Sequence, residues 1–169
     1  AGITRDSLGV KIDKETGEAV IYPEEKFQQV LNVNLLAPIY WSLQMTAGIA
    51  LDRKERGLKK FNPDEESVEG VTVFIGSVSS LGNRGQVSYA STKRGIEGAS
   101  ETLASEGMFH GVRSVVVHPG YTDTPMARAV PEEIIRERAL PHTQIGRLYT
   151  PEEIARTVCF AASNAGIAG

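Results

Sequence analysis

Apolar residues in this chain follow two patterns, and each pattern predicts a different kind of element. Over residues 23–56 they return every three or four positions, which predicts a helix. Pro38 lies inside this helix, and because proline has no backbone N–H we expect a kink near Asn34. Residues 71–75 form an apolar, β-branched run that is typical of a strand buried on both faces of a parallel sheet. Residues 112–117 predict a second buried strand.

A second long helix is predicted over residues 87–107, one side of which carries small residues that suit close packing. A third begins at Thr150, which forms a capping box with Glu153, and runs to about residue 162. Residues 11–22 place a Thr-Gly turn between two short stretches, which predicts a small hairpin or an irregular surface loop. The alternation of helices with buried strands predicts an α/β fold, an open parallel sheet with flanking helices.

The composition is that of one ordinary globular domain, with 169 residues, 41% of them hydrophobic and 23% charged. The net charge of −3 argues against a nucleic-acid surface, and no stretch approaches the ~20 apolar residues of a membrane span. The single cysteine, Cys159, cannot form an internal disulfide, which fits a reducing cytoplasm. Three scattered histidines predict no metal site. We therefore expect a cytoplasmic protein without nucleic-acid or membrane partners.

Tyr89 and Lys93 are the most informative pair, because four residues apart on a helix they share one face. A phenol has a pKa of about 10, and a nearby ammonium lowers it toward the range of acid/base catalysis. Alone, such a pair is usually a surface feature. Ser77 and the dipeptide Pro119-Gly120, however, each follow a predicted strand, and in open parallel sheets the carboxyl ends of the strands form the ligand edge.

Together these segments resemble the short-chain dehydrogenase/reductase family, most closely its 3-oxoacyl-acyl-carrier-protein reductase-like branch. The resemblance implies a Rossmann-like, doubly wound parallel sheet. It covers nearly the whole chain and depends on short motifs in a specific order: Ala1-Gly2, Val33-Asn34-Leu35, Ile75-Gly76-Ser77, Tyr89-Ala90-Ser91-Thr92-Lys93, Pro119-Gly120-Tyr121-Thr122-Asp123-Thr124 and Thr150-Pro151-Glu152-Glu153.

The resemblance implies four catalytic residues. Tyr89 would exchange a proton with the substrate oxygen, Ser77 would hold that oxygen, and Lys93 would lower the Tyr89 pKa and bind the nicotinamide ribose. Asn34 would organise a water that relays protons to Lys93. The cofactor-binding residues implied are Ala1, Gly2, Tyr89, Lys93, Pro119, Gly120, Thr122 and Thr124.

Each of these assignments has an alternative in which the residue has a structural role only. Asn34 could merely cap or kink its helix, and Asn32 lies close by. Ser77 competes with Ser79 and Ser80, and it lies twelve positions before Tyr89, where many family members have thirteen. The threonines at 122 and 124 could be ordinary loop residues.

The expected function is therefore an NAD(P)-dependent oxidoreductase that interconverts a small-molecule carbonyl and alcohol, with NAD and NADP not distinguishable. The family's glycine-rich phosphate-binding turn has no counterpart here. We thus expect residues 1–169 to be the catalytic half of a single domain, with residues 121–149 as a substrate lid and the phosphate-binding part upstream.

Two other functions remain open. One is a non-catalytic assembly module that does not bind cofactor, and the other is epimerase or dehydratase chemistry on the same scaffold. The resemblance also implies a homo-oligomer, a tetramer or a dimer, formed through helices 23–56 and 87–107.

Overall fold

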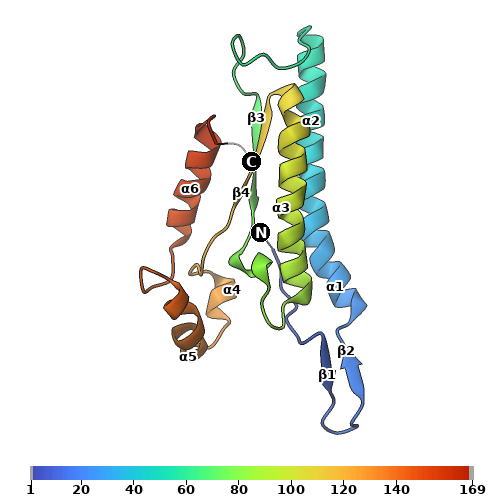
Figure 1. The fold of residues 1–169 in the computed structure, drawn as a ribbon, viewed down its shortest axis with the longest axis vertical. Helices are drawn as coiled ribbons and strands as arrows, with labels where there is room; N and C mark the ends of the chain where they lie inside the picture. Colours follow the sequence, from blue (N-terminus) through green and yellow to red (C-terminus); the bar gives the residue numbers. More distant parts are fainter. Residues whose placement is uncertain (1, 168–169) are drawn as a thin grey trace.

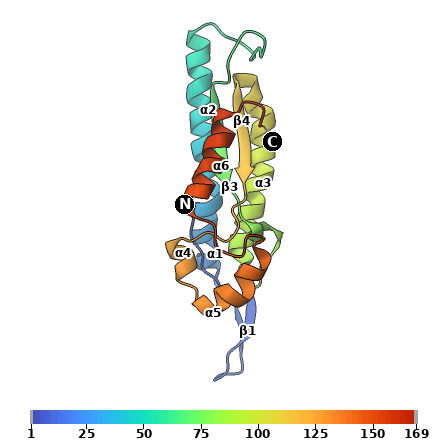
Figure 2. The ribbon, with the colours of Figure 1, turned by 90° about the vertical axis from the view of Figure 1, so that its left-hand side faces the viewer.

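The computed structural model describes residues 2–167, and these fold into three layers around a short parallel sheet. Strands β3 (Gly70–Ile75) and β4 (Val112–Val117) pair in parallel from Gly70 opposite Val112 to Ile75 opposite Val117. Helices α2 (Ala37–Glu55) and α3 (Val87–Gly107) cover one face, and α6 (Pro151–Ser163) covers the other (Figures 1 and 2). The predicted α/β fold is confirmed.

The kink expected near Asn34 is a π-helical turn. Helix α1 (Glu24–Leu31) runs into this turn, Asn32–Leu36, where the Ala37 N–H bonds the carbonyl of Asn32 five residues back. Pro38 explains it, because its ring would clash with the Asn34 carbonyl in a regular helix and it has no N–H to offer. The wider turn keeps the two helices continuous.

The predicted hairpin is present as β1 (Val10–Ile12) and β2 (Ala19–Ile21), paired antiparallel. It projects beyond the end of α1 (Figure 1). Its turn needs Gly17, whose φ of 75° lies in the left-handed region, and the Asp13 carboxylate accepts two backbone N–H groups there.

Small residues on α3 allow the close packing that the sequence predicted. A Cβ at Gly95 would lie 3.1 Å from the Leu35 side chain, and one at Gly107 would lie 2.8 Å from the Val112 carbonyl oxygen. Both positions let α3 approach its neighbours more closely than a larger residue would permit. Ile96, on the same helix, is 1% exposed and belongs to the core with Val30 and Phe74.

The region after β4 holds the short helices α4 (Pro125–Arg128) and α5 (Glu132–Ile134). A π-helical turn, Ile135–Ala139, and a 3-10 turn, Leu140–His142, follow before α6 begins with the predicted capping box. Arg113, buried on β4, fixes the other end of α6. Its guanidinium donates to the carbonyl oxygens of Ala161 at 3.2 Å and Ala162 at 2.9 Å. A cation beside the unpaired carbonyls of the last helical turn stabilises the C-terminal end of a helix.

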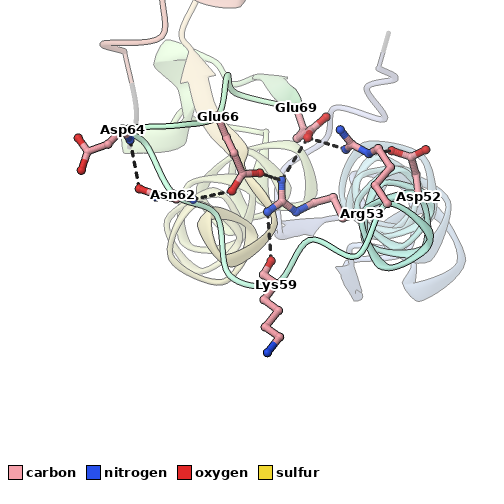
Figure 3. Close-up of polar contacts among 8 residues, drawn as sticks. Asp52, Arg53, Lys59, Asn62, Asp64, Glu66 and Glu69 are labelled. Atoms are coloured by element: carbon pink, nitrogen blue, oxygen red, sulfur yellow. Dashed lines mark hydrogen bonds and ion pairs between the residues drawn. The ribbon is translucent and has the colours of Figure 1, made fainter.

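A buried arginine organises the loop between α2 and β3 (Figure 3). Arg53 is 1% exposed and donates to Glu66 at 2.5 Å, to Glu69 at 3.1 Å and to the Lys59 carbonyl at 3.1 Å. The Arg53 guanidinium, followed by the Asn62 N–H, holds the pKa of the Glu66 carboxyl below its usual range. Ion pairs between Arg53 and the two glutamates therefore hold the loop against the end of α2.

Replacing Glu66 with Gln tests the contribution of its ion pair with Arg53 to stability. The folded-state pKa of Glu66 is lowered, so its contribution to stability is present above the unfolded value of about 4.3 and is lost as pH falls through the folded value. We expect Glu66→Gln to lower the urea midpoint at pH 7, with the difference from wild type shrinking in acid. Glu65→Gln, in the same loop, is the matched control, and equal midpoints for the two variants at pH 7 would contradict the assignment.

Candidate active site

A cavity of about 490 Å³ opens at the carboxyl ends of β3 and β4. It is bounded by the segment before β1, by the end of β3 with the loop that follows, by the start of α3 and by the loop after β4. Eight of the residues singled out from the sequence line this one cavity: Gly2, Ser77, Tyr89, Lys93, Pro119, Gly120, Thr122 and Thr124. Ala1 lies outside the described residues.

Lys93 enters the cavity from inside the protein. It is 4% exposed, its Nζ donates to the Ile75 carbonyl oxygen at 2.7 Å, and it lies 5.6 Å from the centroid of the Tyr89 ring. Burial lowers the pKa of the Lys93 ammonium. Because an ammonium has three N–H donors, two remain for a ligand.

The expected lowering of the Tyr89 pKa by Lys93 is wrong for this structure. Burial raises the pKa of Tyr89; a hydrogen bond with the Ser77 side chain opposes that rise, and the charge of Asp6 adds to it. The Lys93 ammonium is bonded to the Ile75 carbonyl and lies over the Tyr89 ring. Near neutral pH the phenol is held protonated.

Ser77 stands where β3 ends and the following loop begins. Its backbone is extended, and its Oγ accepts from the Ser79 N–H at 3.1 Å, so the hydroxyl has its own proton left to donate. Ser79 lines the same cavity, whereas Ser80 lies close enough to Glu97 to lower the pKa of that carboxyl. Of the three serines, Ser77 is the one whose hydroxyl acts on Tyr89, where it lowers the pKa of the phenol against the larger effect of burial.

Asn34 is buried and bonded to the N-terminal segment. Its side chain, 2% exposed, is fully engaged with Ile3, accepting from the N–H at 2.9 Å and donating to the carbonyl oxygen at 2.8 Å. It lines a second cavity of about 330 Å³, which it shares with Lys93, and not the main one. Pro38, which has no N–H, cannot pair with the Asn34 backbone carbonyl.

The loop after β4 is shaped by its own contacts. Thr122 Oγ1 donates to the Gly120 carbonyl at 3.0 Å, and Thr124 Oγ1 caps α4 by accepting from the Ala127 N–H at 3.3 Å. A Cβ at Gly120 would lie 2.8 Å from the Tyr149 ring, so this position requires glycine. Met126, at the start of α4, also lines the cavity.

Sequence reasoning missed a set of contacts that joins the N-terminal segment to the start of α3. The Tyr22 hydroxyl bonds the Arg5 carbonyl at 2.7 Å and the Ser88 hydroxyl at 2.9 Å, directly beside Tyr89. Asp6 also reaches this region, where it accepts from Gln86 at 2.6 Å. These partners are 66 and 80 positions apart in the chain, and no local pattern signals such pairs.

Comparison with known proteins assigns the family. The model of a family described as "Enoyl-(Acyl carrier protein) reductase" matches residues 5–169. The chain belongs to the short-chain dehydrogenase/reductase family.

Among its relatives, acetoacetyl-CoA reductase of Rhizobium meliloti (strain 1021) is 34% identical over 97% of this chain and 58% of its own length. The 3-oxoacyl-acyl-carrier-protein reductase FabG of Thermotoga maritima is 34% identical over 97% of this chain and 56% of its own. The crystal structure of 3-hydroxyacyl-CoA dehydrogenase type-2 from Mycobacterium avium, at 24% identity, matches with a TM-score of 0.79 over 99% of this chain and 60% of that one. The chain thus spans under two thirds of the length of these proteins.

Two absences hold for the described residues. Between residues 2 and 167, no helix is both long and apolar enough to cross a membrane. The same stretch contains no group of three or more His, Cys, Asp or Glu side chains placed to hold a metal ion.

Replacing Tyr22 with Phe tests the contact between the hairpin and α3. The change removes two hydrogen bonds and leaves the Ser88 hydroxyl, 2% exposed, without this partner. We expect a loss of about 1–2 kcal/mol in the free energy of unfolding, measured by urea denaturation. Tyr40→Phe, at a site 60% exposed, is the control. An effect no larger than that of the control would mean that the contact contributes nothing.

Proposed function

We propose that this protein is an NAD(P)-dependent oxidoreductase that interconverts a carbonyl and an alcohol by hydride transfer. The observation that carries the proposal is the convergence of Ser77, Tyr89 and Lys93 on one cavity at the carboxyl edge of a parallel sheet. The cavity is lined by a hydroxyl, a protonated phenol and a buried ammonium. All three are hydrogen-bond donors, which would stabilise a carbonyl oxygen that gains negative charge.

The chain's own residues bind, orient and protonate the substrate. Ser77 and Tyr89 both donate to the carbonyl oxygen and hold it while charge develops. Tyr89 then transfers its phenolic proton to that oxygen, and in the reverse direction its phenolate accepts the proton. Burial raises the pKa of Tyr89, which keeps the proton available at neutral pH and suits carbonyl reduction. The Lys93 ammonium lies over the Tyr89 ring, 5.6 Å from its centroid, and lines the same cavity.

The polar groups around the cavity fit the nicotinamide end of a dinucleotide, which would supply the hydride. Lys93 has donors to spare for a ribose hydroxyl, and Thr122 and Thr124 offer hydroxyl and backbone groups for the amide. The residues assigned to this binding are Ala1, Gly2, Tyr89, Lys93, Pro119, Gly120, Thr122 and Thr124. NAD and NADP are both compatible with them.

In this proposal residues 1–169 form the catalytic part of one domain, and the phosphate-binding part lies in sequence before them. Residues 121–149 act as a lid over the substrate. Apolar side chains of this region, Tyr121, Met126 and Val130, line the cavity and suit an aliphatic chain. Relatives named for acetoacetyl-CoA and 3-oxoacyl groups support a 3-oxoacyl thioester as substrate. A cytoplasmic location is part of the proposal.

The central test uses the full-length protein and its Tyr89→Phe variant. We expect wild type to oxidise NADH or NADPH in the presence of 3-oxoacyl thioesters, followed by absorbance at 340 nm. Tyr89→Phe should lower kcat at least about 100-fold, because the proton donor is lost, and should leave NAD(P)H affinity unchanged by fluorescence titration. Tyr40→Phe should behave as wild type.

Two outcomes would count against the proposal. Full turnover in Tyr89→Phe would show that Tyr89 is not the proton donor. A wild-type protein that binds no NAD(P)H would favour the alternative, a non-catalytic assembly module.

We also propose that α2 and α3 mediate self-association as a dimer or tetramer. Large apolar side chains stand exposed on α2, with Trp41 at 75% and Leu51 at 63%. Large apolar side chains exposed along one helix favour an interaction surface there.

Replacing Trp41 with Lys tests the surface. A charge there should shift the protein to a smaller species in size-exclusion chromatography with light scattering. Phe160→Lys is the control, because Phe160 lies on α6 and is 59% exposed. A wild-type monomer, or a Trp41→Lys variant with unchanged mass, would rule the assignment out.

A further inference from the structure

Asp6 places a carboxylate in the wall of the cavity that Ser77, Tyr89 and Lys93 share. The residue lies on the N-terminal segment, on no helix or strand, and its side chain is exposed at the cavity rim. A carboxylate in this position has no part in the proton transfer proposed for Tyr89.

The carboxylate is held in place by an oriented amide. Gln86 Nε2 donates to Asp6 Oδ2 at 2.6 Å, and Gln86 Oε1 accepts from Asn83 Nδ2 at 3.0 Å. Next to it, the Ser7 N–H donates to the Gly85 carbonyl at 2.8 Å and Ser7 forms a parallel bridge with Gln86. Since Gln86 directly precedes α3, Asp6 is fixed relative to the helix that carries Tyr89.

The charges around Asp6 leave its own charge facing the cavity. The titratable side chains among the described lining residues are Asp6, Tyr89, Lys93 and Tyr121. Lys93, the cation among them, is buried, and its ammonium is bonded to the Ile75 carbonyl oxygen. The neighbouring Arg5 is occupied elsewhere, donating to Gln29 at 3.2 Å and to the Thr4 carbonyl at 2.8 Å.

We propose that Asp6 makes this cavity select 3-oxoacyl substrates whose carboxyl group is masked as a thioester or ester over the free 3-oxo acids. The inference rests on the proposed function. In a 3-oxo acid the carboxylate is separated from the reacting carbonyl carbon by a single CH₂ group. When Ser77 and Tyr89 hold the carbonyl oxygen, that carboxylate must lie in the cavity with Asp6. Like charges repel, whereas a thioester or ester brings no charge.

The same carboxylate acts on Tyr89. The charge of Asp6 raises the pKa of Tyr89, in addition to the larger effect of burial. Asp6 therefore has two measurable effects, one on substrate charge and one on the phenol, and both depend on its negative charge. A purely structural role, in which Asp6 only tethers Gln86, would produce neither.

The first experiment compares Asp6→Asn with wild type on ethyl acetoacetate and acetoacetate, which present the same ketone with and without a carboxylate. Asparagine keeps an oxygen for the Gln86 amide and removes the charge. We expect the ratio of kcat/KM, ester over acid, to fall roughly threefold to tenfold in Asp6→Asn, because an exposed charge pair is screened by water. Added salt should lower the wild-type ratio and leave the variant ratio unchanged.

Two further variants serve as controls. Asp64→Asn, at an exposed carboxylate in the loop between α2 and β3, should leave the ratio as in wild type. Asp6→Glu keeps the charge and should retain the selectivity. An unchanged ratio in Asp6→Asn, or an equal fall in Asp6→Glu, would overturn the proposal.

The second experiment needs no turnover. Ionisation of Tyr89 is followed by absorbance at 295 nm in the full-length protein, with Tyr89→Phe identifying its share of the signal. Asp6→Asn should shift the Tyr89 titration to lower pH, and Asp64→Asn should not. A protein that reduces neither ketone contradicts the proposed function, whereas an unshifted Tyr89 titration in Asp6→Asn contradicts the role of Asp6.

Discussion

The hydrogen bond from the buried Lys93 ammonium to the Ile75 carbonyl joins the two parts on which the site depends. Ile75 is the last residue of β3, and Lys93 lies one turn after Tyr89 on α3. A buried ammonium is costly without a partner, so the helix cannot slide along the sheet without losing this bond. The distance between the strand end with its serine and the helix with its tyrosine is set in this way.

The third wall of the site comes from the N-terminal segment, and a proline fixes where it lies. Pro38 widens the helix into a π-helical turn, and the turn contains Asn34. The Asn34 side chain then bonds both the N–H and the carbonyl oxygen of Ile3, as the backbone of a neighbouring strand would. A helix defect thus positions the segment that carries Gly2 and Asp6, and it explains why Asn34 is buried and points away from the main cavity.

Much of the fold and part of the site follow from local patterns. The strands at 70–75 and 112–117, the helix at 87–107 and the Thr150 cap were predictable, because hydrophobic periodicity and capping act over a few residues. The effect of Lys93 on Tyr89 was not predictable. Residue spacing predicts the shared helix face, but burial decided the direction of the Tyr89 pKa.

The sequence by itself determined the α/β order of elements, the family resemblance and the identity of Tyr89, Lys93 and Ser77 as candidates. Only the tertiary structure decided that Asp6 and Gln86 share the wall with Tyr89 and that Tyr22 bonds Ser88. The physical reason is the range of the forces involved. Hydrophobic periodicity and helix caps depend on residues that are neighbours in the sequence. Hydrogen bonds and charges act between any groups that the packing of α3 on the sheet brings together.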